Sequence, residues 1–133
     1  MNDRSPARRL PLHLGLPALL LCLGAGSAAA RTLQVGPGKQ FSLPSAAAAQ
    51  ALDGDLIQIA PGRYVDCAVW RANNLVITGM GLPQDTVIAD KSCSGKGLFL
   101  TNGTGITVRN LTLTGARVPD KNGAGAAWQC RVI

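Results

Sequence analysis

The residues of this chain that could perform chemistry are a few aspartates and cysteines. The chain contains no glutamate, and its one histidine is His13. Asp90 and Asp120 are each followed by a lysine, in segments that have the pattern of loops. Acid–base catalysis by carboxylates needs two such groups facing one substrate, and the sequence around these two aspartates does not suggest such a pair. We therefore interpret both as solvated loop charges and assign no catalytic residue, no cofactor site and no metal site.

Residues 1–30 have the pattern of a secretory signal peptide. Three arginines precede an apolar run over residues 10–24, and alanines at 28–30 offer the small residues that a signal peptidase recognises. A transmembrane helix is the alternative, but two prolines and His13 interrupt the run. We expect cleavage before Arg31 and a secreted or periplasmic protein with no membrane association after cleavage. Removal of His13 with the leader excludes a Ser-His-Asp triad and a histidine-ligated zinc site.

The segment GITVRNLTLTG alternates apolar and polar residues but slips once. Ile106 and Val108 form one apolar pair, while Leu111 and Leu113 form another that begins three residues further on instead of two. In a straight strand the slip would turn the second pair to the opposite face of the sheet. Asn110 lies at the slip, and asparagine tolerates the left-handed backbone of a sharp corner. The pattern predicts two short strands joined at a structural corner.

A second copy of this pattern lies earlier in the chain. The segment LVITGM places Leu75 and Ile77 with the spacing of the first apolar pair of the later copy. Gly79 stands at the slip where the later copy has Asn110, and glycine is equally suited to left-handed backbone. The sequence therefore predicts structural corners at Gly79 and Asn110, with Ile77 corresponding to Val108.

Other short strands and one helix complete the pattern. Strands are expected at residues 55–60, 64–70, 86–89 and 97–100. An alanine-rich helix is expected to start at Ser42 or Pro44 and to end at Asp53-Gly54, with one apolar side made by Phe41, Leu43, Ala47 or Ala48, and Leu52. Such a helix would cover the first coil of a solenoid, whose open end exposes strand edges.

The spacing between the copies is irregular, which suits coils of constant strand framework and variable loops. A sandwich of short antiparallel strands is the alternative. We expect an all-β chain, a parallel β-helix of about three coils with a short N-terminal capping α-helix. Cys67 and Cys93 lie 26 residues apart, about one coil plus a loop, and we predict a disulfide between them. Cys130 is then unpaired or joined to another chain.

The chain resembles the right-handed parallel β-helix superfamily of pectin-lyase-like proteins. The run GDLIQIAPGRY that ends at Tyr64, followed by LVITGMG and TVI, is similar to the N-terminal coils of that superfamily, and the resemblance covers residues 32–125. It implies a right-handed β-helix. Enzymes of the superfamily act on polysaccharides through acidic residues, calcium or an Arg or Lys base, and none of those motifs matches here residue by residue.

The end of the chain departs from the pattern. We divide the sequence into a signal peptide over residues 1–30, β-helix coils with the capping helix over 31–125, and a tail over 126–133. Trp128 and Cys130 stand in this tail without the expected alternation. We interpret the tail as the aberrant end of a truncated product. The alternative is a naturally short domain whose tail caps its open end.

Two functional hypotheses follow, besides a fragment without activity. The first is an N-terminal segment of an exported β-helix protein that binds polysaccharide, or is part of a polysaccharide-active protein, with no complete active site in this chain. Its outward-facing groups would be Thr107, Arg109, Thr112 and Thr114. The second is a non-enzymatic, adhesin-like surface module. Self-association through an exposed last coil is a further expectation. Nucleic acid is excluded as a partner because the basic residues are scattered.

Overall fold

The computed structural model of the protein describes residues 29–118, 124–127 and 130–132. Within these ranges the chain forms mainly short strands and one short α-helix. The elements are β1 (Thr32–Val35), α1 (Pro44–Gln50), β2 (Leu56–Ile59), β3 (Gly62–Val65), β4 (Ala68–Trp70), β5 (Val76–Gly79), the 3-10 turn η1 (Pro83–Asp85), β6 (Thr86–Ala89), β7 (Gly97–Thr101), β8 (Ile106–Arg109), β9 (Thr112–Thr114), β10 (Ala124–Ala127) and β11 (Cys130–Val132). Residues 1–28 of the predicted signal peptide, Asp120 and Trp128 lie outside the described residues.

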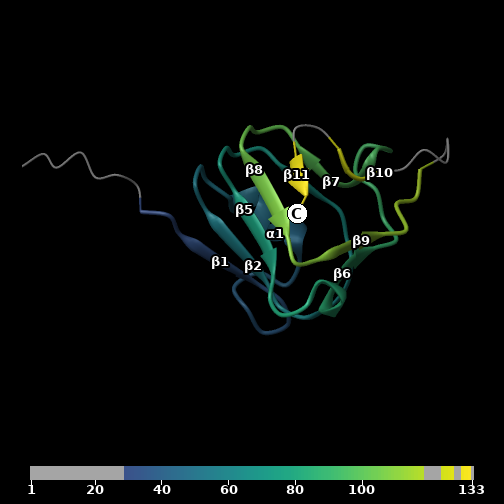
Figure 1. Ribbon diagram of the computed structural model, residues 1–133, viewed down its shortest axis with the longest axis horizontal. Helices are drawn as coiled ribbons and strands as arrows, with labels where there is room; N and C mark the ends of the chain where they lie inside the picture. Colours follow the sequence, from purple (N-terminus) through teal and green to yellow (C-terminus); the bar gives the residue numbers. More distant parts are fainter. Residues whose placement is uncertain (1–28, 119–123, 128–129, 133) are drawn as a thin grey trace, which may run out of the picture.

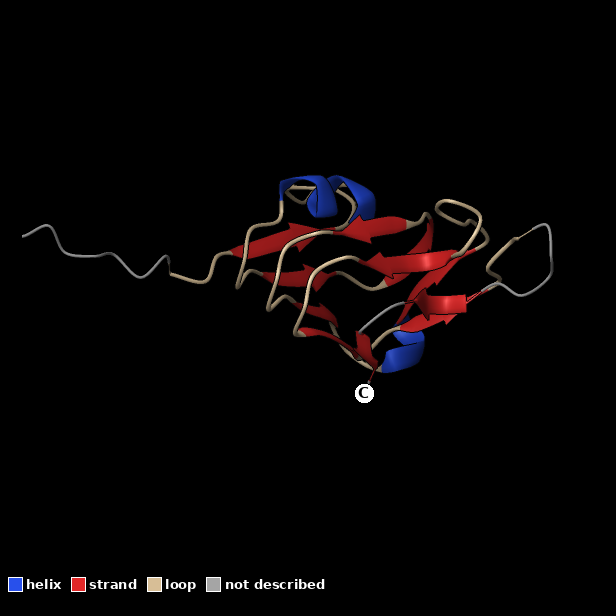
Figure 2. Ribbon diagram, turned by 90° about the horizontal axis from the view of Figure 1, so that it is seen from above, coloured by secondary structure: helices blue, strands red, loops and turns tan. Residues whose placement is uncertain are grey.

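The strands form three sheets in which the paired strands are all parallel. The sheet orders are β1-β2-β5-β8-β11, β3-β6-β9 and β4-β7-β10. Successive rounds of the chain therefore each add one strand to each sheet. Figure 1 shows β1, β2, β5 and β8 lying side by side, and Figure 2 shows the repeated rounds from above. The expectation of a strand-rich chain with one short helix is confirmed, and parallel pairing excludes the antiparallel sandwich.

The interior is filled by apolar side chains that stack in register. One inward row of the first sheet consists of Leu33, Ile57, Ile77 and Val108, all of them buried. Trp70 and Phe99 from the third sheet meet edge to face, with ring centroids 5.5 Å apart. Burying side chains of this size contributes about 1.5–3 kcal/mol each, so these rows are the main source of stability. Ile77 and Val108, which correspond in the two copies of the sequence pattern, pair with each other.

Helix α1 begins at Pro44 and packs against β4, the outer strand of the third sheet, and against β1. Proline is favourable in the first helical turn because its missing N–H would have no intrahelical partner there. Ala47 and Ala48 are buried, as predicted. Leu43 and Leu52 were expected on the same covered side, and this is wrong. The helix ends at Gln50, so both leucines lie outside it and are 39% and 60% exposed.

The two structural corners occur at equivalent places but for different reasons. Asn110 has a φ of 55°, the left-handed conformation that the slip in the pattern predicts. The same conformation was expected at Gly79, and this is wrong, because Gly79 is not at positive φ; Gly81, two residues further on, has a φ of 99°. Gly79 is required for space instead. A Cβ there would lie 2.0 Å from the main-chain oxygen of Asn110 in the next round.

Two expectations about strands need correction. Residues 64–70 were predicted as one strand, but β3 ends at Val65 and β4 starts at Ala68, since the chain turns from the second sheet into the third between them. The tail was expected to lack a strand pattern. Nevertheless β10 pairs with β7 and β11 pairs with β8, and Val132 stands opposite Val108. Strands of three or four residues carry too little alternation to be recognised alone.

Candidate functional site

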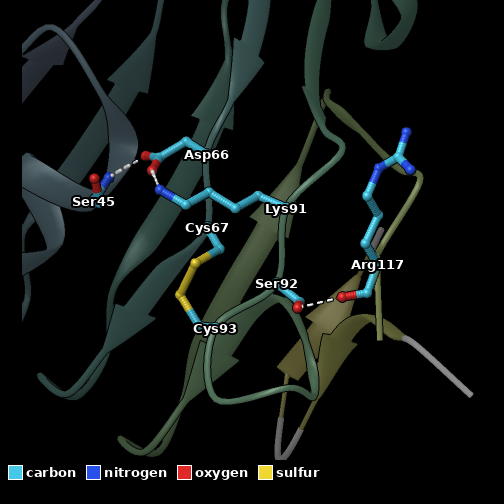
Figure 3. The surroundings of a disulfide bond; sticks show 7 residues. All are labelled: Ser45, Asp66, Cys67, Lys91, Ser92, Cys93 and Arg117. Atoms are coloured by element: carbon cyan, nitrogen blue, oxygen red, sulfur yellow. Dashed lines mark hydrogen bonds and ion pairs between the residues drawn. A yellow bond between two sulfur atoms is a disulfide. The ribbon is translucent and has the colours of Figure 1, made fainter. Parts of the chain in front are cut away.

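A disulfide and a cluster of charged residues lie where the chain leaves β3 and β6 (Figure 3). Cys67 and Cys93 are joined, with their Cα atoms 5.5 Å apart, so the predicted disulfide is confirmed. The two cysteines belong to successive rounds, because β3 and β6 pair directly. The bond therefore fastens one round of the chain to the next.

Asp66 connects this cluster to the helix. Its carboxylate is buried and accepts a hydrogen bond of 2.8 Å from the main-chain N–H of Ser45, in the first turn of α1. The Nζ atom of Lys91 lies 4.0 Å from the same carboxylate. Leu43, at the N-cap position of α1, offers no side-chain cap. Asp66 supplies that missing cap from the following round, where a negative charge also suits the helix dipole.

Asp90 occupies the place in the next round that Asp66 occupies in its own, since Val65 pairs with Ala89. Its carboxylate forms an ion pair with Arg63 and lies 4.0 Å from Nη2 of Arg117. Asp90 was interpreted as a solvated loop charge. Its side chain is 31% exposed but has two arginine neighbours, whereas Lys91 faces Asp66. Asp66 and Asp90 thus stand at equivalent places in successive rounds, and three basic side chains lie within 4.0 Å of their carboxylates.

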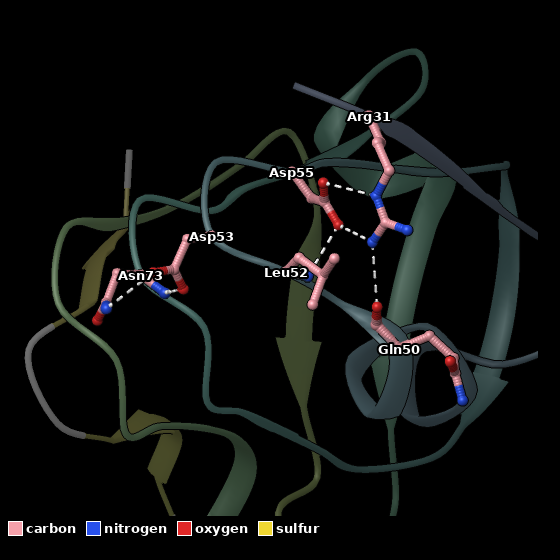
Figure 4. A network of polar contacts seen from close by, with 6 residues as sticks. All are labelled: Arg31, Gln50, Leu52, Asp53, Asp55 and Asn73. Carbon is pink, nitrogen blue, oxygen red and sulfur yellow. Dashed lines mark hydrogen bonds and ion pairs between the residues drawn. The ribbon is translucent and has the colours of Figure 1, made fainter. Parts of the chain in front are cut away.

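A second network fixes the start of the first sheet (Figure 4). Arg31 donates two hydrogen bonds to the carboxylate of Asp55, of 3.2 Å from Nε and 2.6 Å from Nη2. The same Nη2 donates to the main-chain oxygen of Gln50 at the end of α1, and the N–H of Leu52 donates to Asp55. Asp55 is buried, yet the hydrogen bonds from Arg31 hold its pKa below the ordinary value. Sequence analysis missed this pair, because nothing in the spacing of the two residues connects them.

This lowered pKa predicts a pH dependence of stability. Because the pKa of Asp55 is lower in the folded than in the unfolded protein, its stabilising contribution is complete above the unfolded value of about 3.9 and is lost as the pH falls from there through the lower pKa of the folded protein. We expect Asp55→Asn to lower the free energy of unfolding by about 2 kcal/mol at pH 7. We also expect it to flatten the loss of stability between about pH 5 and pH 2, where the folded carboxylate of the wild type takes up its proton. Urea unfolding of both proteins across that range measures the difference. Parallel curves for the two proteins would contradict the assignment.

A column of polar residues precedes β2, β5 and β8. The N–H of Asn73 donates to Asp53 at 2.8 Å, and the N–H of Thr104 donates to the side-chain oxygen of Asn73 at 2.9 Å. Each residue of the column is followed by one in the left-handed conformation, at Gly54, Asn74 and Gly105. Sequence analysis missed this repeat. The signal was an Asp-Gly, Asn-Asn or Thr-Gly pair just before each strand.

The outer face of the first sheet carries a stacked polar row. We call Gln34, Gln58, Thr78 and Arg109, which pair in register, the outer polar row. Nε2 of Gln34 donates to Oε1 of Gln58 at 2.7 Å, and the Thr78 hydroxyl donates to the main-chain oxygen of Gly79. The neighbouring outward row holds the half-buried Leu56 and Val76, which also pair. Thr78 is buried, so the accessible polar groups that border this apolar strip are the amides of the two glutamines and the guanidinium group of Arg109.

The four residues predicted to face outward together are divided between two sheets. Thr107 and Arg109 lie on β8 in the first sheet, whereas Thr112 and Thr114 lie on β9 in the second. The Thr112 hydroxyl donates to the main-chain oxygen of Pro83 at 2.8 Å and so contributes to packing of the 3-10 turn. These four residues do not form one surface. The side chains of Gln34 and Gln58, which do share a face with Arg109, were not singled out in the sequence.

All the aspartates in the described part of the chain have polar partners. The one not yet mentioned is Asp85, which accepts a hydrogen bond from the N–H of Leu82.

Within the described ranges no three residues of the metal-binding types gather into a group that could hold a metal ion. Over the same ranges, no helix has the length and apolar character needed to cross a membrane.

Comparison with known proteins does not place the chain in a family. No family model, no curated protein and no solved structure matches it.

Proposed function

We propose that the chain forms the first coils of a right-handed parallel β-helix in an exported protein, similar to the pectin-lyase-like superfamily. The succession of parallel pairs supports this, because β2, β3 and β4 are each continued by a strand of the next round and again by a strand of the round after it. Such rounds close around an interior when each sheet faces the other two. The inward rows from the first and third sheets belong to one buried cluster with Tyr64 and Ile88 of the second.

The function that the surface supports best is binding of an extended polysaccharide across the outer face of the first sheet. The observation that carries this proposal is the outer polar row beside the strip made by Leu56 and Val76. Sugars present hydroxyl groups at their edges and apolar C–H groups on their ring faces, so their sites combine apolar contact with a few placed polar groups. Strands about 4.8 Å apart repeat those groups along the direction in which a chain crossing the strands would lie.

Affinity electrophoresis in gels containing polygalacturonate or a neutral β-glucan tests this proposal. We expect at least one of these polysaccharides to retard the exported protein. We expect the double variant Gln58→Ala/Arg109→Ala to bind at least tenfold more weakly, because it removes one amide and the exposed cation from the outer polar row. Thr114→Ala is the matched control, since Thr114 is an exposed polar residue on a strand of the second sheet.

Retardation by neither polysaccharide, or equal weakening by Thr114→Ala, would overturn the binding proposal. Thermal melting of each variant establishes that the fold is retained.

If the binding proposal is overturned, an adhesin-like structural module is the remaining function. It is favoured by the cross-links between rounds, in which Cys67 is joined to Cys93 and Asp66 holds the first turn of α1.

A further inference from the structure

Among the residues described from Ala29 onward, hydrogen bonds to the body of the fold begin at Arg31. Ala29 and Ala30 are exposed and belong to no strand. Both the main chain and the side chain of Arg31 are bound. The main-chain oxygen of Arg31 accepts a hydrogen bond of 2.8 Å from the N–H of Leu56, and its guanidinium group binds Asp55. The next residue, Thr32, opens β1 and pairs with Leu56.

The same position is the one at which the sequence provides a cleavage signal. An apolar run over residues 10–24 is followed by Ala28 and Ala30, the small residues required three positions and one position before a signal peptidase cut. The structure adds an independent observation about the described residues, in which Ala29 and Ala30 are exposed and the side chain of Arg31, immediately after that signal, is held by Asp55. Removal of residues 1–30 breaks none of the contacts described for Arg31, Asp55 and Leu56.

We propose that the Ala30–Arg31 peptide bond is a processing site for signal peptidase and that Arg31 is afterwards locked as the first residue. Water adds to the Ala30 carbonyl carbon and the C–N bond breaks. Ala30 leaves as a carboxylate, and the new amino group of Arg31 takes up the proton released and becomes an ammonium group. Aminopeptidases then stop at Arg31, because the following bond joins a hydrogen-bonded carbonyl to the first residue of a strand. The inference rests on the export part of the proposed function and not on carbohydrate binding.

Expression of the full chain in a secretion-competent bacterial host, followed by N-terminal sequencing of the exported protein, tests the cut. We expect the sequence Arg-Thr-Leu-Gln-Val. We expect Ala30→Lys to accumulate unprocessed, because a long charged side chain does not suit the position before the cut. Ala29→Lys is the matched control and is expected to be processed like the wild type, since its position lies between the two recognised ones.

The lock is tested on the same exported protein with a broad-specificity aminopeptidase. We expect the wild type to retain Arg31 and the variants Asp55→Asn and Arg31→Ala to lose N-terminal residues at least tenfold faster. Arg31→Ala leaves the Leu52–Asp55 hydrogen bond in place and so serves if Asp55→Asn does not fold.

Any other result would overturn the processing site, the export of the protein or the protection of Arg31, as follows. A different N-terminal sequence on exported protein, or normal processing of Ala30→Lys, overturns the processing site while leaving export and carbohydrate binding untouched. Retention of the whole chain inside the cell with residues 1–30 intact overturns export itself. Trimming of the wild type as fast as of both variants overturns the lock.

Discussion

Replacing Gly79 with alanine is expected to lower the free energy of unfolding by at least about 3 kcal/mol. The added Cβ would lie 2.0 Å from the main-chain oxygen of Asn110 and 3.0 Å from the Cβ of Thr86. Both Gly79 and Thr86 are buried, and the closest atom is backbone in a neighbouring round, so no flexible side chain can move aside. The rounds would have to separate locally, with loss of the packing of Ile77 on Val108. Urea unfolding of the wild type and the variant measures the effect.

Gly38→Ala is the matched control for this substitution. A Cβ at Gly38 would meet nothing within 4 Å, although its φ of +70° is left-handed. We expect a cost of about 1 kcal/mol there, from backbone conformation alone. If Gly79→Ala were no more destabilising than Gly38→Ala, the close contact between the two rounds would not exist in solution.

The register of β5 on β8 in the first sheet could be predicted from the sequence, because each of these two strands carries a recognisable apolar pair. Ile77 and Val108 each belong to an apolar pair that is followed by a slip, and aligning the two slips aligns the strands. The slip also located the left-handed Asn110. The error at Gly79 has a physical origin. Glycine is used both for positive φ and for close approach of another segment, and a single sequence does not separate these two reasons.

The polar networks could not be predicted in the same way. Arg31 and Asp55 are brought together by the pairing of β1 with β2, and Asp66 reaches Ser45 only because α1 lies beside β4. Such contacts depend on three-dimensional positions that carry no periodic pattern in the chain. The outer polar row was missed for a related reason. Its glutamines are unremarkable in each strand, and only the register of β1 on β2 places them together.

Loss of the Cys67–Cys93 disulfide is the second large effect expected. The bond closes a segment with a sequence separation of 26 residues, and the loop-closure entropy that it removes from the unfolded chain corresponds to about 3.5 kcal/mol. We expect Cys67→Ser to lower the free energy of unfolding by about that amount. Reduction of the wild type with dithiothreitol is expected to give the same loss, since both treatments remove the same covalent link between rounds.

Treatment of the Cys67→Ser variant with dithiothreitol provides the control. Cys93 and Cys130 both remain in the variant, so any bond between them would make its stability sensitive to the reductant. We expect no further change, because Cys130 opens β11 in the first sheet, opposite Ile106, whereas Cys93 follows β6 and bridges to Gly97 at the start of β7. A further drop would contradict this placement and indicate an exchange of partners. An unchanged unfolding midpoint would support a single bridge that holds two successive rounds together from outside the apolar core.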